Sequence, residues 1–355
     1  KMLKIDYQLN LNTIIENNQG QHYIINFIKL NINKLNLNDP FALVSLVYLN
    51  YIKVFEFLVY LTLNCNFIIN FDIPINDGFN VILIATLTGN LEIIKLLSNY
   101  VNINVQDKNG ITPLIHAVKN DNKEIVNFLV SNEKVDVNIT DNFYDTALHY
   151  AIMFKRNTIM KLIISSKNFN SKIRTTYGDT YLIRVVSNND EIGCKIMLDS
   201  NKFDVNETND FKNSALHYSS IDGNYEITKN LLENGKVNIN SQDKDGDTSL
   251  LNACRGEHLD IVKLLLDYNA DINIKNNNEE TPLLLAIASN NIYLLKILLQ
   301  NNKINVNYRF PLHLAARYNN LQFVKLLIND RTDLNLVDDD GYTPLMISIV
   351  NFNYN

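Results

Sequence analysis

The sequence has few cysteines and no cluster of basic residues, and each scarcity excludes a class of function. Its three cysteines, Cys65, Cys194 and Cys254, lie far apart, form no C-x-x-C pair and are not spaced with histidines as metal ligands. We therefore expect no metal site and a reducing, cytoplasmic environment. Because the formal net charge is -6 and no basic cluster offsets it, we expect neither nucleic acid nor an anionic membrane as the main partner.

Catalytic motifs are also missing. The chain has no Gly-rich phosphate loop, nucleophile elbow or zinc helix motif. The acidic run that starts at Asp243 resembles a calcium loop, but an EF-hand needs glycine sixth and glutamate twelfth, whereas here glycine comes fourth and Cys254 twelfth. Carboxylate pairs such as Glu279–Glu280 fall in expected turns, where little burial would tune their pKa. We predict no catalytic residues, no metal and no cofactor, and hence no enzyme.

One apolar stretch, residues 41–63, is long enough to span a bilayer. It contains Lys53 and Glu56, and each charge would cost about 2.5–3.5 kcal/mol at the centre of a membrane helix. Asn50 falls where other segments of the chain show a break between two helices. We therefore predict two packed helices in this stretch, and no membrane span.

Asparagine, in contrast, is abundant and makes up about one residue in six. We interpret this abundance as the codon composition of an AT-rich genome. The longest uninterrupted run is Asn276–Asn278, which is too short for an aggregating asparagine tract.

A six-residue pattern recurs along the chain at nearly constant spacing. Its first position holds Thr112, Thr146, Thr180, Ser214, Thr248 and Thr281, which are 34 residues apart except for the last step of 33. The copies read TPLIHA, TALHYA, TYLIRV, SALHYS, TSLLNA, TPLLLA, FPLHLA and TPLMIS. Further copies begin at Asn80, Phe310 and Thr343, with degenerate ones near Phe41 and Leu11. We count about ten repeats.

Each repeat has the same internal order. A Thr or Ser caps a first helix, and a proline, where present, takes the first helical position, which needs no N–H. A polar break follows, then a second helix with a denser apolar set, such as EIVNFLV, and then an extended piece rich in Asn, Asp and Gly that favours a turn. A helix pair this small cannot bury its apolar faces alone, so we predict a solenoid that is stabilised by contacts between neighbouring repeats.

This pattern resembles the ankyrin repeat, whose signature is T-P-L-H-x-A, then G-x-x-E-I-V-x-x-L-L, then a D-x-x-G finger. The resemblance covers residues 70–355 and most of 11–70. It implies an all-α solenoid of about ten stacked helix-turn-helix repeats with short β-hairpin fingers, in which fingers and first helices line a concave groove. We divide the chain into degenerate N-terminal repeats at residues 1–70 and an ankyrin array at 71–355.

Three repeats depart from the regular pattern, and each departure leads to a prediction. The step from Thr281 to Phe310 is only 29 residues, so the finger before Phe310 is shortened, and the step of 39 residues from Phe41 to Asn80 contains an insertion. The last repeat is truncated before its second helix. From this truncation we expect a longer natural polypeptide.

The resemblance also implies a structural role for most of the histidines. In the family, the motif histidine bonds the threonine hydroxyl and the backbone of the neighbouring repeat, and His149, His217 and His313 occupy that position. His116 lies one position later, so its partner is not fixed by the pattern. Tyr150 and Tyr218 fall where the family places a core leucine, and we expect them to be partly buried.

Contact positions in the family lie at the finger tips and near the ends of the first helices. Three successive tips here are aromatic, 34 residues apart, and their neighbours on either side are polar, which is the composition of an interaction hot spot. The predicted partner-binding residues are Phe143, Met153, Phe154, Tyr177, Phe211 and Ile221. The alternative is that the rings pack against neighbouring fingers. The later fingers are acidic. Their carboxylates either belong to solvated turns or attract a basic peptide.

These observations predict a non-catalytic scaffold or adaptor that binds a protein partner on its finger and first-helix face. We expect a cytoplasmic protein that acts as a monomer or as part of a larger chain or assembly. Two alternatives remain open. The chain could be the targeting or regulatory module of a larger enzyme or ion channel, or a structural spacer in a large assembly.

Overall fold

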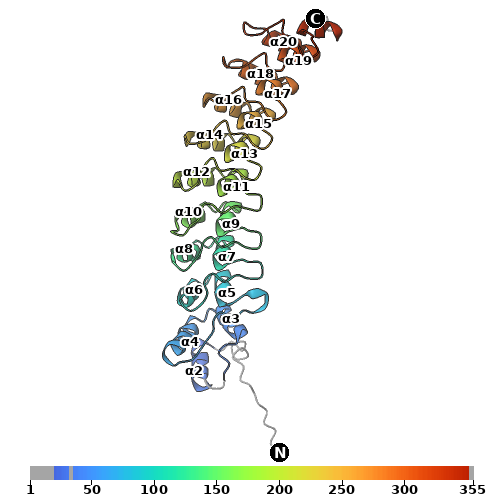
Figure 1. The fold of residues 1–355 in the computed structure, drawn as a ribbon. Helices are drawn as coiled ribbons and strands as arrows, with labels where there is room; N and C mark the ends of the chain where they lie inside the picture. Colours follow the sequence, from blue (N-terminus) through green and yellow to red (C-terminus); the bar gives the residue numbers. More distant parts are fainter. Residues whose placement is uncertain (1–19, 32–34, 352–355) are drawn as a thin grey trace, which may run out of the picture. The chain divides into compact units, whose positions relative to one another are not determined.

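The protein, described by a computed structural model over residues 20–31 and 35–351, divides into two compact units. Unit 1 comprises residues 1–176 and unit 2 comprises residues 177–355. Each unit is a stack of short helix pairs, one pair in each repeat except the last, of which the described residues contain only the first helix (Figure 1). The degenerate repeat expected near Leu11 lies outside the described residues.

In unit 1, the first helices of the repeats are α3 (Pro40–Tyr48), α5 (Val81–Leu87), α7 (Pro113–Lys119) and α9 (Ala147–Met153). The second helices are α4 (Ile52–Asn64), α6 (Leu91–Leu97), α8 (Lys123–Ser131) and α10 (Asn157–Ser165). A further helix, α2 (Gln21–Asn31), packs on α4, and a 3-10 turn, η2 (Asn76–Gly78), forms in the finger before α5.

In unit 2, the first helices are α11 (Tyr181–Ser187), α13 (Ala215–Ile221), α15 (Ser249–Arg255), α17 (Pro282–Ala288), α19 (Pro311–Arg317) and α21 (Pro344–Val350). The second helices are α12 (Glu191–Ser200), α14 (Tyr225–Glu233), α16 (Leu259–Asp267), α18 (Ile292–Leu299) and α20 (Leu321–Leu327).

Like packs on like within each unit. First helices contact the first helices of the neighbouring repeats, as α7 does with α5 and α9, and second helices contact second helices, as α8 does with α6 and α10. The predicted solenoid of stacked repeats is thereby confirmed. The described residues contain no strand, and the isolated bridge between Gln242 and Thr248 is their one β interaction. The β-hairpin geometry expected of the fingers is therefore not confirmed.

The sequence pattern of each repeat explains its local structure. The Thr112 side chain accepts a hydrogen bond from the Ile115 N–H at 3.2 Å, and Pro113 follows at the first helical position. The same cap forms at Thr180, Thr248, Thr281 and Thr343. A cap of this kind contributes about 1 kcal/mol to helix stability. The predicted helix starts are confirmed.

The second helices contribute a buried apolar face to the core between repeats, beside that of the first helices. In α8, Ile125, Val126 and Leu129 are fully buried, and Leu231 occupies the position of Leu129 in α14 and is equally buried. Because these side chains meet the second helices on either side, each repeat seals the apolar face of its neighbour.

The apolar stretch at residues 41–63 forms the two helices α3 and α4, which pack together. Asn50 adopts a left-handed backbone conformation, with φ of 55°, at the break between them. The prediction of two packed helices is thus confirmed. Among the described residues, no helix combines the length and the apolar character needed to cross a membrane.

A ladder of asparagines joins neighbouring repeats along the edge that follows the second helices. Asn138 donates from Nδ2 to the Asn168 carbonyl at 2.7 Å and accepts from the Asn170 N–H at 2.8 Å. Asn206 makes the equivalent pair of bonds in unit 2, to Lys236 and Asn238. The other members of the ladder are Asn38, Asn104, Asn273 and Asn307. The ladder gives these asparagines a structural role that the interpretation from codon composition leaves out.

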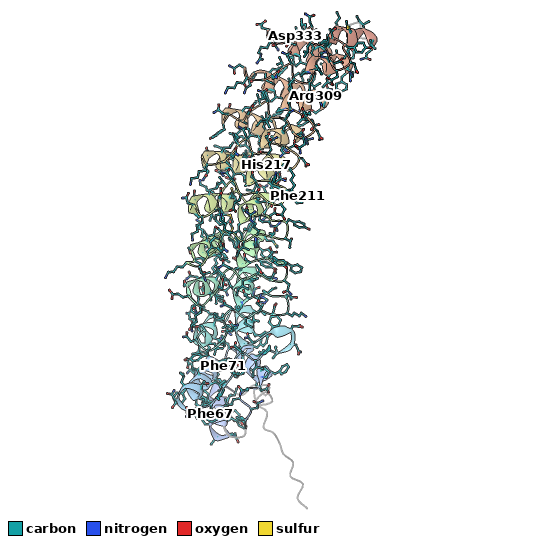
Figure 2. The ribbon with its side chains drawn as sticks, viewed as in Figure 1. Phe67, Phe71, Phe211, His217, Arg309 and Asp333 are labelled. Carbon is teal, nitrogen blue, oxygen red and sulfur yellow. The ribbon has the colours of Figure 1, made fainter. Side chains whose placement is uncertain are left out.

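The ladder persists where the repeat is shortened. Asn273 reaches a carbonyl 30 residues ahead, but Asn307 makes the same bond across only 24 residues, to the Arg331 carbonyl. Asn307 also accepts from the Asp333 N–H at 2.9 Å. Most of the missing residues belong to the predicted short finger, where Arg309 and Phe310 both have positive φ angles; Arg309 and Asp333 are labelled in Figure 2.

Candidate functional site

In six fingers, one Asp or Asn at the base holds the turn. Asp141 Oδ1 accepts hydrogen bonds from the Phe143 N–H at 2.8 Å and the Asp145 N–H at 3.0 Å. The remaining bases of this type are Asp107, Asn209, Asp243, Asn276 and Asp338. The side chain of the base residue accepts from the backbone N–H groups two and four residues later, and this closes the turn. The tip residue, two positions after the base, therefore projects from the turn. At Asp243 this confirms a finger turn in place of a calcium loop.

The tip of the last finger in unit 1 is aromatic and exposed. Phe143 has 72% of its surface exposed, and Tyr144 beside it is also exposed. The neighbouring finger supports this tip, because the Asn109 carbonyl accepts from the Asn142 N–H at 3.1 Å. Phe143 is therefore a projecting apolar side chain on a backbone fixed from two sides.

An anchored tyrosine connects that finger to its first helix. The Tyr150 hydroxyl donates to Asp141 Oδ2 at 2.6 Å, and burial, together with this bond, raises the pKa of the hydroxyl. Lys119 Nζ lies 4.9 Å from the centre of the Tyr150 ring, and the Phe154 ring stacks on it at 6.3 Å. Met153 and Phe154 are exposed beside it. In unit 1 the structure thus brings Met153 and Phe154 together at the end of α9.

In unit 2 the aromatic tips lie on adjacent fingers. The Asp210 N–H donates to the Tyr177 carbonyl at 3.3 Å, and the Lys244 N–H donates to the Phe211 carbonyl at 3.0 Å. Tyr177 is 68% exposed and Phe211 is 52% exposed, although Lys244 Nζ lies 5.6 Å above the Phe211 ring. Figure 2 labels Phe211 on a loop and His217 among the helices. The strip of three aromatic tips stays a prediction, since Phe143 belongs to the other unit.

The exposed end of α13 adds Ile221 to the unit 2 surface. It lies beside Asp222, a carboxyl whose pKa is raised by burial. Tyr218, one turn earlier, accepts a hydrogen bond from Asn209 Nδ2 at 3.0 Å. Tyr218 is partly buried, as predicted, and Tyr150 is buried more fully than predicted. Both tyrosines also connect the finger base to the first helix.

The acidic residues of the later fingers serve the structure. Arg255 Nη2 lies 3.0 Å from Asp247 Oδ2 and 3.2 Å from Glu280 Oε2, so it bridges two neighbouring fingers. Asn276 Nδ2 donates to both carboxylates at 2.8 Å. This network of paired charges leaves fewer carboxylates for a basic peptide than the sequence indicates.

The histidines also have structural partners. His217 Nδ1 accepts from the Ser214 N–H at 3.1 Å and its Nε2 lies 3.0 Å from the Ser241 carbonyl of the next repeat. His313 Nε2 reaches the Tyr342 carbonyl in the same way. His116 pairs instead with the finger base, at 3.1 Å from Asp107 Oδ2. Burial lowers the pKa of both His116 and His217.

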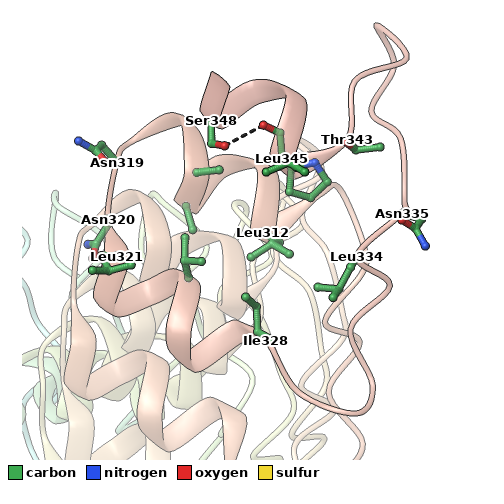
Figure 3. A pocket seen from close by; sticks show the side chains of 14 residues that line it. Leu312, Asn319, Asn320, Leu321, Ile328, Leu334, Asn335, Thr343, Leu345 and Ser348 are labelled. Atoms are coloured by element: carbon green, nitrogen blue, oxygen red, sulfur yellow. Dashed lines mark hydrogen bonds between the residues drawn. The ribbon is translucent and has the colours of Figure 1, made fainter. Parts of the chain in front are cut away.

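A hollow of about 430 Å³ lies among α19, α20 and α21 (Figure 3). Its lining is mainly apolar and includes Leu312, Leu321, Val324, Ile328 and Leu345. The hollow is lined by side chains of two successive repeats, from α19 and α20 and from α21. Its apolar lining is that of the space between repeats, and no convergent polar or charged groups mark it as a ligand site.

Comparison with known families agrees with this geometry. A family model described as "Ankyrin repeats (3 copies)" matches residues 13–141, 82–175, 148–243, 216–309 and 285–355. These overlapping matches extend over most of the chain. The chain belongs to the ankyrin-repeat family.

Relatives of this ankyrin array include parts of very long proteins. The chain is 38% identical over 88 residues to the neurogenic locus Notch protein of Drosophila melanogaster, a match that covers 25% of this chain and 3% of Notch. It is 34% identical over 79 residues to alpha-latrocrustotoxin-Lt1a of Latrodectus tredecimguttatus, covering 22% of this chain and 6% of the toxin. The array thus matches only a small part of each of these relatives.

Solved structures show the same fold. The ankyrin-repeat domain of Bcl-3, a member of the IkappaB protein family, superposes with a TM-score of 0.58 at 23% identity, and the match covers 63% of this chain and 99% of that domain. Ankyrin repeats generally mediate protein–protein interaction, and the family and its fold are typically non-catalytic. Among the described residues, no group of three or more His, Cys, Asp or Glu could hold a metal ion.

Sequence reasoning missed two kinds of residue in this ankyrin array. It did not find the pairs between finger base and first helix, such as Asp107 with His116, whose signal is a constant separation of nine residues. It also overlooked exposed apolar residues at the ends of α3 and α5, namely Tyr48 and Leu87. Their repeats begin with Phe41 and Asn80 and so lack the Thr or Ser that aligned most of the others.

Proposed function

We propose that this protein is a non-catalytic scaffold or adaptor that binds a protein partner on its finger and first-helix face. One observation carries the proposal: the aromatic tips Phe143, Tyr177 and Phe211 are all more than half exposed on fingers whose backbones are fixed by hydrogen bonds. Exposed aromatic side chains on a rigid support lose little conformational entropy on binding, and such residues dominate interaction hot spots.

The neighbouring first-helix residues extend this surface. Met153 and Phe154 add to Phe143 in unit 1, and Ile221 adds to Tyr177 and Phe211 in unit 2. The alternative, in which the rings pack against neighbouring fingers, fits less well with side chains this exposed. A cytoplasmic location follows the same proposal, since none of the cysteines is paired.

A pull-down from the native source tests the fingertip residues. The variant Phe143→Ala/Tyr177→Ala/Phe211→Ala is expected to retain its circular dichroism spectrum and to lose partner capture at least about tenfold. The matched control removes three exposed aromatics from second helices or the ends of these helices, Tyr60→Ala/Tyr268→Ala/Tyr293→Ala, and is expected to capture normally. Unchanged capture by the folded fingertip variant would reject these residues as the binding site.

A second candidate function is that of a targeting or regulatory module in a larger enzyme or ion channel, or of a spacer in a large assembly. It is favoured by the finding that the chain matches only 3% and 6% of the lengths of two relatives. Sequencing the complete transcript tests it. A catalytic or membrane-spanning domain in the same reading frame would support the module, and an isolated array would reject the module and leave the spacer.

A further inference from the structure

The last residues of the first helices in unit 1 form a row of structurally equivalent positions. Each lies two residues before a residue with a left-handed backbone, at which the chain turns into the second helix. The turn residues are Asn50, Gly89, Asp121 and Lys155. The equivalent positions are Tyr48, Leu87, Lys119 and Met153, which we call the unit 1 row. Because α3, α5, α7 and α9 stack in that order, the row runs along the stack with one residue in each repeat.

The unit 1 row is apolar and exposed except at one position. Tyr48 is 64% exposed, Leu87 is 38% exposed and Met153 is 44% exposed. Leu49 and Phe154, the residues that directly follow two members of the row, are exposed as well. The residue before each row member is buried in the core, so the row is the edge where the helix surface changes from core to solvent. Exposed apolar side chains gathered in this way mark an interaction surface.

Lys119 provides the single charge of the row. Its ammonium lies on the Tyr150 ring, and no carboxylate of the described residues lies within 4 Å of it. The nearby Asp121 pairs with Arg156 at 3.1 Å instead. Since the Tyr150 hydroxyl is held by Asp141, the ring supports the lysine at a fixed place. A partner can therefore supply the carboxylate that Lys119 lacks.

The spacing of the row selects the conformation of a partner. Stacked helices lie about 8–10 Å apart, so successive row residues recur at about that distance. Seven residues of an α-helix rise about 10.5 Å, and residues seven apart lie on the same face. In an extended strand, about three residues cover this distance, and residues three apart point to opposite faces. An α-helix can therefore contact the row residue of every repeat with side chains on one face, whereas a strand cannot.

We propose that the unit 1 row binds an amphipathic α-helix of a partner protein. Apolar residues of this helix recur every seven positions against Tyr48, Leu87 and Met153, and an acidic residue in the corresponding place pairs with Lys119. Apolar burial supplies the affinity and the single ion pair sets the register. The inference rests on the proposed function, because it assigns a class of partner to one part of the first-helix face.

A designed peptide tests the proposal with the full 355-residue chain. The probe is a fluorescein-labelled helical peptide of about 25 residues, with Leu at positions i, i+7 and i+21 and Glu at i+14 on an Ala/Gln/Lys background. Fluorescence anisotropy measures its affinity. The double variant Tyr48→Ala/Leu87→Ala is expected to weaken binding at least about tenfold, since each truncation removes a buried apolar contact. The matched control changes equivalent positions of unit 2, Ser187→Ala/Arg317→Ala, and is expected to leave the affinity unchanged.

A charge exchange tests the register. The Lys119→Glu variant is expected to bind the Glu peptide more weakly than the wild type does, and to bind a peptide with Lys at i+14 more tightly. Equal binding of both peptides by both proteins would overturn the proposal, as would a folded double variant that binds normally. Equal binding of a proline-containing, non-helical version would also overturn it. So would sedimentation showing a dimer of this chain that the double variant abolishes, because a second copy would then occupy the row.

The result of the peptide-binding experiment can be distinguished from the result of the fingertip pull-down. The residues changed here are Tyr48, Leu87 and Lys119, and none of them belongs to the fingertip variant. Loss of capture by the fingertip variant with no peptide binding to the row would reject the helix and keep the scaffold. Failure of both experiments would reject both.

Discussion

At the ends of their first helices, the two units carry different chemistry on the same backbone. Unit 1 ends these helices mostly with exposed apolar residues such as Tyr48, Leu87 and Met153. Unit 2 places charged residues, Arg255 and Arg317, at two of the equivalent positions, where each lies close to a finger carboxylate. The caps, the finger bases and the asparagine ladder are nevertheless shared. The caps, finger bases and ladder that build the repeat are therefore common to both units, while the residues at the exposed ends of the first helices differ.

The largest expected effect concerns the shared core, because Leu129 and Leu231 occupy equivalent, fully buried positions in α8 and α14. Leu129→Ala and Leu231→Ala are each expected to cost about 2–5 kcal/mol, since both leave a cavity between second helices. Hydrogen exchange in peptides that cover α8 and α14 measures the local free energy of opening. A cost below about 1 kcal/mol in only one unit would break the comparison.

The tyrosines that connect fingers to first helices extend the comparison between the two units. Tyr150→Phe is expected to cost about 1.5–3 kcal/mol, because it removes the hydroxyl that donates to Oδ2 of the charged Asp141 carboxylate. Tyr218→Phe removes a bond to the neutral Asn209 and is expected to cost only about 0.5–1.5 kcal/mol. Urea denaturation of the two variants provides the test. Equal costs would show that the charge on Asp141 contributes nothing.

The asparagine ladder predicts a smaller effect that is the same in both units. Asn138→Ala and Asn206→Ala each remove two hydrogen bonds on a solvent-exposed edge, so each is expected to cost about 1 kcal/mol. Asn278→Ala is the control, because the Asn278 side chain belongs to no rung of the ladder. Thermal unfolding measures all three variants, and an Asn278→Ala effect as large as the others would remove the special role of the ladder.

The smallest effect at neutral pH involves the buried histidines, His116 in unit 1 and His217 in unit 2. Burial lowers the pKa of both imidazoles in the folded chain below the ordinary histidine value of 6.5. The unfolded chain therefore takes up protons first, and the stability contributed by the neutral imidazoles is present above pH 6.5 and is lost as the pH falls from 6.5 through the folded-state pKa. Denaturation from pH 7.5 to 5 is expected to show falling stability. In His116→Asn and His217→Asn the slope should be shallower, and a slope that stays unchanged would exclude these two groups.

Much of the fold follows from local chemistry that is legible in the sequence. Thr112 and Pro113 predict a helix start because their side chains act on adjacent backbone groups, and Asn50 predicts a break because it falls where other segments break between two helices. The apolar spacing of α8 likewise predicts its buried face. These features depend on neighbours a few residues away, so one sequence is enough to find them.

The surface was harder to predict because it depends on side-chain contacts and exposure that arise only in the folded, stacked repeats. His116 lies off its expected motif position, and only the folded finger shows that Asp107 is its partner. Tyr48 and Leu87 gave no signal, since their repeats lack the aligning motif and their exposure depends on stacking. The aromatic tips were found from their spacing, and their exposure is visible only in the folded units.

The shortened repeat at Asn307 has a consequence for how such a protein can change. The loss of six residues between Asn307 and its carbonyl partner leaves both rungs of the ladder intact, because the deletion falls mainly in the finger. Insertions and deletions at the finger tips can therefore accumulate without altering the register of the repeats. The asparagine edge acts as a ruler that keeps repeats aligned, and the opposite edge is free to acquire loops of new length and, with them, new binding specificities.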